Sequence, residues 1–573
     1  MTPGLNLFGI GVAGMDVPAF LAAARPVFLL GALAWLALLR RWPRPWWLLA
    51  GVIAANAWVW AVTNYPLQRL YALGPSPDRV NNLGLVQVVA AGNSPLRTVQ
   101  VGQLHFEPFW GVVVAALSGW NPDRVLRLYP FLSLVMVTAF ALALYLGLRP
   151  PPDARTDAWS AWERVLIAGF ATLLCATPLD FISTYRVAWV RTFLLKPNHA
   201  LGLVLVPLLL AAFVRIGTWR GRLLTGLLLH VIGWAFVLHM AYVSAGLLLF
   251  ALYSVAVRLP ERRRDLLDAV VVVGVNLLVV SPYLFMLLVG YPFLVRAPHL
   301  VLPAGSPHLL ETTVRTGWVF WLGLWGATVA YRRGDRLGRL WAAQLAAALL
   351  IWAGYLLLGA IGLVREADEV HHWLRVLFAA SAGIGAWDLA GRLERRMGWS
   401  LSPAVRAGAV ALLVLPSSLP YWWDPWRMDP SFQRSVDPLP ELLRAPTTFL
   451  RTRTEPDAVV ASDPDLARYV AALGARRVLI SGGMNASADA SRRWLLLEAL
   501  LRDTDGRAVR PAAAEYGVRY LAVTPALLKR HPPVTLADLD RRPHLRRVHL
   551  TGDPHADFVV VYRLEPDVET AGR

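Results

Sequence analysis

The sequence predicts an all-α polytopic membrane bundle of about twelve spans, followed by a C-terminal soluble α/β domain. Three observations support this fold class. The 573 residues are 56% apolar and 16% charged, with a mean hydropathy of +0.47, whereas soluble domains carry roughly 25% charged residues. Apolar runs fill residues 26–420, and many have the length of about 17 to 25 residues that crosses a bilayer. From residue 421 the composition becomes that of a soluble domain.

The individual spans follow from windows of about 19 residues. They fall near residues 26–39, 46–63, 124–148, 163–178, 199–215, 222–238, 240–257, 266–289, 316–331, 340–363, 373–390 and 404–420. Arginine clusters occupy alternate loops between these spans: Arg40, Arg41 and Arg44; Arg149, Arg155 and Arg164; Arg215, Arg220 and Arg222; Arg258 and Arg262 to Arg264; Arg332, Arg333, Arg336 and Arg339; Arg392, Arg395 and Arg396. The positive-inside rule makes these loops cytoplasmic.

The opposite loops and both termini then face outward. The predicted organisation is a transmembrane domain over residues 1–420 with an outward loop at 64–123, a linker at 421–440 and an extracytoplasmic α/β domain at 441–573. The predicted location is the cytoplasmic (inner) membrane of a prokaryote, so membrane lipids are expected partners.

The positive charge indicates topology and not a nucleic-acid partner. The formal net charge is +18, but residues 421–573 hold 22 basic and 20 acidic residues, which leaves about +16 in the membrane part. Cys175 is the single cysteine, which excludes intrachain disulfides and cysteine-based metal sites.

The tail alternates short apolar strands with helices, a pattern typical of a small α/β domain. Strands are predicted at 457–461, 477–480, 518–524, 548–550 and 558–563, and helices at 464–473 and 491–501. The tail has no clustered acid, histidine and nucleophile. We therefore expect it to assist acceptor or partner binding and to carry no reacting group.

The first outward loop has the most informative order of residues. Asp78 comes just outside a span and is followed by an amphipathic stretch, Leu83 to Ala91, and by the turn Gly92-Asn93-Ser94-Pro95. His105-Phe106-Glu107-Pro108 then leads into the apolar run Phe109 to Leu117. That run is too short to span, so we expect a helix in the membrane interface.

This order resembles the GT-C superfamily of membrane glycosyltransferases, in which an outward loop carries an acidic residue, an amphipathic helix, a glycine turn and a proline-led juxtamembrane helix. The resemblance implies that Asp78 is the acidic position. It also implies transfer of a sugar from a lipid-linked, polyprenyl-phosphate donor to an acceptor glycan, lipid or protein on the outward face. The chain differs in an extra span ahead of the loop and in lacking a paired acid beside Asp78. No cofactor is therefore assigned, and a divalent cation stays an open alternative.

Sugar transfer requires a carboxylate that takes the acceptor proton and cations that stabilise the departing phosphate. Asp78 is the candidate base and Glu107 the second choice. The candidate phosphate ligands lie just outside predicted span ends: Arg191, Lys196 and Arg375. Histidines in the same outward segments complete the candidate substrate-binding set: His105, His199, His371 and His372.

Each candidate has a simpler structural explanation. Asp78 can be the N-cap of a helix that begins near Val80, and Arg375 and Lys196 can anchor span ends by snorkelling. His371 and His372 can belong to a solvated loop, and adjacent helical positions project about 100° apart, which disfavours a shared metal. His239 is expected to be a hydrogen-bonded interior histidine.

Two other functions remain compatible with the sequence. A transporter or flippase of lipid-linked sugars would place ionisable groups near the membrane midplane, often on broken helices. A non-catalytic scaffold for envelope assembly would keep the fold without turnover. Polar residues gather at one face here and mid-span charges are scarce, which favours the enzyme over the transporter.

Overall fold

The computed structural model describes residues 5–7, 10–12, 44–64, 77–101, 108–149, 159–174, 197–290, 318–360, 367–411, 441–481 and 489–565, with single positions between 30 and 41. It divides into two compact units. The first comprises Met1–Leu67, Phe131–Pro282 and Ala297–Gln433; the second comprises Gln68–Pro130, Tyr283–Arg296 and Arg434–Arg573.

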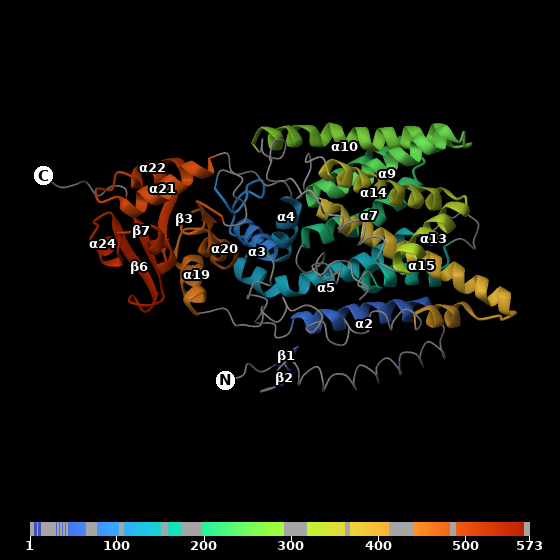
Figure 1. Cartoon of the computed structure of the whole chain (residues 1–573), viewed down its shortest axis with the longest axis horizontal. Coiled ribbons are helices and arrows are strands. Elements are labelled where there is room, and N and C mark those ends of the chain that lie inside the picture. Colours follow the sequence, from blue (N-terminus) through green and yellow to red (C-terminus); the bar gives the residue numbers. More distant parts are fainter. Residues whose placement is uncertain are drawn as a thin grey trace. The chain divides into compact units, whose positions relative to one another are not determined.

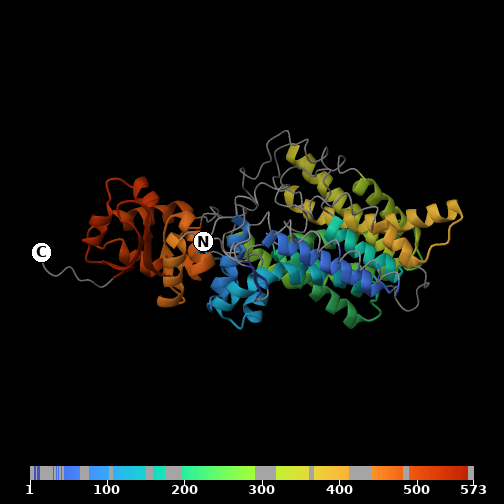
Figure 2. The ribbon, with the colours of Figure 1, turned by 90° about the horizontal axis from the view of Figure 1, so that it is seen from below.

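The first unit is a bundle of helices that run side by side (Figures 1 and 2). Its helices are α2 (Pro45–Asn64), most of α5 (Pro122–Gly147), α6 (Ala161–Gly169) with the π-helical turn Phe170–Leu174, α7 (Pro197–Val214), α8 (Trp219–Ala235), α9 (Val237–Ala256), most of α10 (Arg262–Gly290), α13 (Trp318–Arg332), α14 (Arg336–Ala360) and α15 (Ala367–Met397). Residues 403–411 are also helical. A short antiparallel pair, β1 (Leu5–Leu7) and β2 (Ile10–Val12), belongs to the same unit.

Helices occur at all ten predicted spans between residues 46 and 390. Among the described residues, three helices are long and apolar enough to cross a membrane: Val237–Ala256, Arg262–Phe285 and Arg336–Gly354. The bent pair Pro122–Tyr129 and Leu134–Gly147 would make a fourth. The chain is therefore a membrane protein with several apolar helices, and the total of about twelve spans stays a prediction. Most of the predicted first span, 26–39, and the linker lie outside the described residues.

Small residues let these helices approach closely, as is common where helices pack in membranes. A Cβ atom added to Gly326 of α13 would lie 1.7 Å from the carbonyl oxygen of Ser381 in α15. One added to Gly383 of α15 would lie 2.8 Å from the Cα atom of Ile167 in α6. No larger side chain fits at either crossing without moving a helix.

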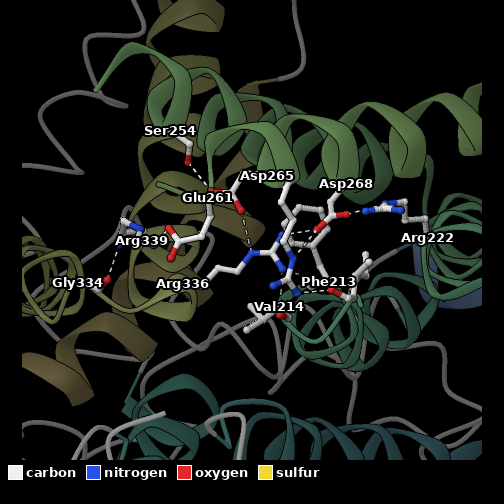
Figure 3. A network of polar contacts seen from close by, with 12 residues as sticks. Phe213, Val214, Arg222, Ser254, Glu261, Asp265, Asp268, Gly334, Arg336 and Arg339 are labelled. Carbon is white, nitrogen blue, oxygen red and sulfur yellow. Dashed lines mark hydrogen bonds and ion pairs between the residues drawn. The ribbon is translucent and has the colours of Figure 1, made fainter. Parts of the chain in front are cut away.

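A network of hydrogen bonds and ion pairs connects the ends of several helices of the bundle (Figure 3). Asp265 and Asp268, in the first two turns of α10, are both 0% exposed. Arg336 of α14 donates from Nε to Asp265 at 3.0 Å and from Nη2 to Asp268 at 2.5 Å. Arg222 of α8 donates to Asp268 at 2.7 Å, and the Ser254 hydroxyl of α9 donates to Asp265 at 2.8 Å.

Further arginine-rich loops contact one another at the same end of the bundle. Arg336 also donates to the carbonyl oxygen of Val214 at the end of α7. Arg333 pairs with the buried Glu163 of α6, and Arg215 donates to the Arg149 carbonyl oxygen at 2.6 Å. The structure thus brings together four of the loops that the arginine pattern assigned to one membrane side. Their cytoplasmic orientation stays a prediction.

The second unit contains the predicted α/β domain. Its mixed five-stranded sheet has the order β4 (Arg477–Val478), β3 (Val459–Ala461), β5 (Val518–Val523), β7 (Phe558–Leu564) and β6 (Leu545–Gly552). β4, β3 and β5 are parallel, whereas β7 is antiparallel to β5 and to β6. All five predicted strands and both predicted helices, seen as α20 (Pro464–Gly474) and α21 (Ala490–Arg502), are confirmed.

Apolar clusters cover both faces of this sheet. Leu450 of α19 (Glu441–Arg453) and Leu466 and Val470 of α20 pack on one face. Helices α21 and α22 (Val509–Tyr516) pack on the other, together with residues of the short helices α23 (Pro525–Arg530) and α24 (Leu536–Asp540). The sequence pattern missed α19, α22, α23 and α24, because their apolar residues are few or broken by proline, as at Pro446 and Pro511.

Replacing Arg336 by alanine should destabilise the bundle strongly. The substitution leaves two buried carboxylates short of their shared cation, and breaking a buried pair in this way costs roughly 3 to 5 kcal/mol. The expected result is a markedly lower thermal unfolding midpoint for the detergent-solubilised protein. Arg332→Ala, which removes an exposed arginine four residues earlier, is the matched control. Equal midpoints for the two variants would contradict a stabilising role for the network.

Candidate functional site

Helix α3 carries the candidate base. It extends over Pro77–Ala90, so Asp78 occupies the second helical position and not the predicted N-cap before Val80. Proline suits the first helical position because its missing N–H needs no partner there. A carboxylate in the first turn is favoured by the positive end of the helix dipole. The described structure fixes the place of Asp78 on the helix but does not extend to its side chain.

The C-terminal part of α3 is buried on all sides. Residues 83–90 are all buried, so the prediction of an amphipathic stretch here was wrong. The helix packs against α4 (Pro108–Leu117) and against α20 of the α/β domain, and all three lie together in Figure 1. A Cβ added to Gly84 would lie 3.1 Å from the Cβ of Ala471. Glycine at this position therefore permits the close contact between α3 and α20.

The predicted turn after α3 is confirmed. Gly92 has φ +93°, a conformation that glycine adopts without strain. The backbone N–H groups of Gly92 and Asn93 donate to the carbonyl oxygens of Val89 and Val88, which closes the helix end. The Asn93 side chain donates to Val88 and to the carbonyl oxygen of Pro456. The turn is thus tied to the α/β domain.

The chain beyond the turn joins the edge of the α/β sheet. Gln100 forms a parallel bridge with Val478 of β4. The Val478 N–H donates to the Val99 carbonyl at 2.9 Å, and the Val101 N–H donates to the Val478 carbonyl at 3.0 Å. The Gln100 side chain accepts from the Ser481 N–H at 3.1 Å. No local sequence pattern predicted this pairing, because the paired segment is only a few residues long.

Four sequence candidates lie outside the described residues, namely His105, Glu107, Arg191 and Lys196. Their roles stay predictions. Helix α4 begins at Pro108, directly after Glu107, so the predicted proline-led helix is present. Five of its residues are buried, including Trp110 and Val114.

In the first unit, four ring side chains meet at one end of the bundle. This histidine cluster consists of His199, Phe236, His239 and Trp373. The His199 ring lies 3.5 Å from the Phe236 ring and 5.9 Å from the His239 ring, measured between centroids. The His239 ring lies 4.6 Å from Phe236 and 5.8 Å from Trp373. The starts of α7, α9 and α15 therefore come together here.

His239 is an interior residue, as predicted, but it is not hydrogen bonded within the described structure. It is 0% exposed, and neither of its ring nitrogens has a partner among the described residues. A Cβ added to Gly202 of α7 would lie 2.6 Å from its Nδ1 atom. The contact requires glycine at position 202.

Helix α15 begins at Ala367, so most of the predicted loop at 364–372 is helical. His371, His372 and Arg375 are positions in its first turns, beside the buried Trp373. The structure does not describe their side chains. Through Trp373 and His239, it brings this segment of α15 close to His199 at one end of the bundle. Among the described residues, no three His, Cys, Asp or Glu side chains form a group that could hold a metal ion.

The sequence matches no protein-family model and no curated protein sequence. The structure, however, is similar to ArnT from Cupriavidus metallidurans, solved bound to undecaprenyl phosphate: the TM-score is 0.52 at 14% identity, over 91% of this chain and 99% of ArnT. It is also similar to the Archaeoglobus fulgidus oligosaccharyltransferase in its apo form, with a TM-score of 0.50 at 11% identity, over 84% of this chain and 70% of that one. Both proteins are GT-C membrane glycosyltransferases. The resemblance to this superfamily is thus confirmed at the level of the fold.

Enlarging Gly84 should loosen the contact between α3 and the α/β domain. Gly84→Leu places new side-chain atoms against Ala471, and overpacking of this kind costs typically 1 to 3 kcal/mol. A lower thermal unfolding midpoint is expected, with partial recovery in the double variant Gly84→Leu/Ala471→Gly. Gly274→Leu is the control, because nothing lies within 4 Å of a Cβ at that glycine. A Gly84→Leu midpoint equal to wild type would show that the two helices do not pack as described.

Proposed function

We propose that this chain is a membrane glycosyltransferase that moves a sugar from a polyprenyl-phosphate-linked donor to an acceptor on the extracytoplasmic face of a prokaryotic inner membrane. The observation that supports it most is the GT-C fold together with α3, whose first turn holds Asp78. The glycine turn and the proline-led α4 follow in the order that the resemblance implied.

In the proposed reaction, the Asp78 carboxylate takes the proton of an acceptor hydroxyl. The acceptor oxygen attacks the anomeric carbon of the donor sugar, and the bond from that carbon to the phosphate oxygen breaks. Polyprenyl phosphate departs with the electron pair, so the anomeric configuration is inverted. Glu107, just ahead of α4, is the second choice for the base.

The departing phosphate requires cations. Arg375 in the third turn of α15 is proposed to bind it together with Lys196 and Arg191 before α7, since a guanidinium can form two hydrogen bonds with one phosphate. His199, His371 and His372 would line the same region, and His105 would contact the substrate from the outward loop. The assignment of His199 is supported by its place beside the start of α15.

The position of the charges favours this function over a transporter. A transporter is expected to place ionisable residues near the midplane. Among the described helices from α7 to α14, Asp, Glu, Lys and Arg residues occur only in the first two turns or the last turn of a helix. Those at the α10 and α14 starts are held in the ion-pair network.

The direct test incubates the purified protein with radiolabelled polyprenyl-phosphate sugars and an extract of envelope acceptors. Release of polyprenyl phosphate together with transfer of label is the expected result. Binding of the donor without release, across a panel of sugars and acceptors, would contradict an enzyme and support the scaffold.

Asp78→Asn should keep the side-chain shape and remove the base. We expect turnover to fall by about 10² to 10⁴, which is typical of the loss of a general base, with donor binding largely kept. The change also removes a favourable charge from the first turn of α3, worth about 0.3 to 1 kcal/mol, so the unfolding midpoint should move little.

Turnover and thermal stability are measured on the same preparation, with the exposed Asp505→Asn as control. If Asp78 only stabilises the helix, turnover per folded molecule will equal that of wild type, and Asp78 will then have no catalytic role.

Arg375→Ala should weaken donor binding. Loss of a hydrogen bond to a charged group costs roughly 1.5 to 3 kcal/mol, which corresponds to about a 10- to 150-fold rise in the dissociation constant of the donor. Arg396→Ala is the matched control, because Arg396 is an exposed arginine in the last turn of the same helix. Equal donor affinity in the two variants would assign Arg375 to membrane anchoring.

A further inference from the structure

Two neighbouring arginines at the start of β4 in the α/β domain differ in their hydrogen-bond partners. Arg476, which is 2% exposed, donates to Thr454 Oγ1 and to the carbonyl oxygens of Ala475, Arg451 and Thr454. Arg477 has no such set: its Nε and Nη2 atoms are buried, and neither has a hydrogen-bond partner among the described residues.

Arg477 is held in place by backbone pairing on both sides of β4. It is the register partner of Val459 in β3, which belongs to a buried apolar cluster. On its other side, the bridge between Gln100 and Val478 sets Val99 beside Arg477, and Arg97 comes two residues earlier. The guanidinium is therefore partly buried at a fixed place on the sheet edge.

Among the described residues, the charge that acts on Arg477 is that of a second cation, Arg97. Burial lowers the pKa of Arg477, and the positive charge of Arg97 lowers that pKa further. Arginine stays protonated in proteins, so both guanidinium groups carry a full charge. Within the described residues, Arg97 has no ion pair either, and no carboxylate neutralises the two groups.

We infer that Arg97 and Arg477 form a binding site for an oxyanion, either phosphate or carboxylate. Buried charges are generally paired, and two guanidinium groups on adjacent segments at the sheet edge offer planar N–H donors to such anions. The site lies on the segment that follows the Gly92 turn, within the same unit as the α/β domain. It is independent of the proposed sugar transfer, since neither arginine takes part in that reaction.

The probe is radiolabelled inorganic phosphate in equilibrium dialysis with the full-length protein in a neutral detergent, at constant ionic strength. Wild type should bind phosphate, and Arg477→Gln and Arg97→Gln should each weaken binding by about 10-fold or more, the effect of losing a charged hydrogen bond. Arg97 is exposed, so its variant tests the site even if the more buried Arg477→Gln folds poorly. Arg507→Gln, at a side chain that is 88% exposed, should bind as wild type does.

Two outcomes would overturn the inference. One is no phosphate binding by wild type. The other is binding that survives in both arginine variants, including the case in which it is lost only in Arg375→Ala, which would place the anion at the proposed donor site.

The source of the oxyanion is distinguished by repeating the dialysis in lipid nanodiscs. If anionic phosphatidylglycerol displaces the labelled phosphate from wild type, relative to phosphatidylcholine alone, a lipid headgroup reaches the site. If phosphate binding is the same in both lipids, the ligand is a soluble phosphate or carboxylate. Either result upholds the arginine pair as the site.

Discussion

The arrangement of helices in the first unit depends on the ion pairs that neutralise buried charges in its apolar interior. Asp265 and Asp268 are fully buried in α10, and an unpaired carboxylate there would be costly. Arg336 contacts both of them, and Arg222 contacts Asp268. These pairs require α8, α10 and α14 to start at the same end of the bundle, because each charged residue lies in the first two turns of its helix.

The ion-pair network joins helices at one end of the bundle, whereas the histidine cluster lies at the opposite ends of α7 and α9. The carbonyl groups of Phe213 and Val214 at the end of α7 bind Arg336, whereas His199 at its start joins the histidine cluster. Helix α9 is arranged in the same way, with Ser254 in the ion-pair network and His239 in the cluster. Helices α7 and α9 thus each carry a contact with the ion-pair network near one end and a member of the histidine cluster near the other.

Local patterns predicted much of the fold because apolar runs and period-two strands are set by sequence alone. They could not place contacts between distant segments. The pairing of Gln100 with Val478 joins residues 378 positions apart. The polar Gln87 made α3 look amphipathic in the sequence, but in the structure this side chain is buried and donates to the Pro122 carbonyl oxygen. Of the candidate site, the pattern predicted Asp78 in an outward loop, and the structure places this residue in the first turn of α3. The approach of His199 to the start of α15 follows from helix packing, which no local signal encodes.

Several structural arginines in the two units have oxygen partners within the chain, and comparison with them supports an anion site at Arg97 and Arg477. Inside the bundle, buried Glu residues pair with some of the arginines, as Glu163 does with Arg333 and Glu394 does with Arg406. In the α/β domain, Arg476 satisfies its donors with carbonyl and hydroxyl oxygens. Both solutions fix a guanidinium in place without a ligand. Arg477 uses neither, although it is equally well positioned by its strands, and Arg97 adds a second positive charge beside it. Since a folded chain readily supplies acceptors to arginines that serve only structure, this pair is best explained by an anion that binds from outside.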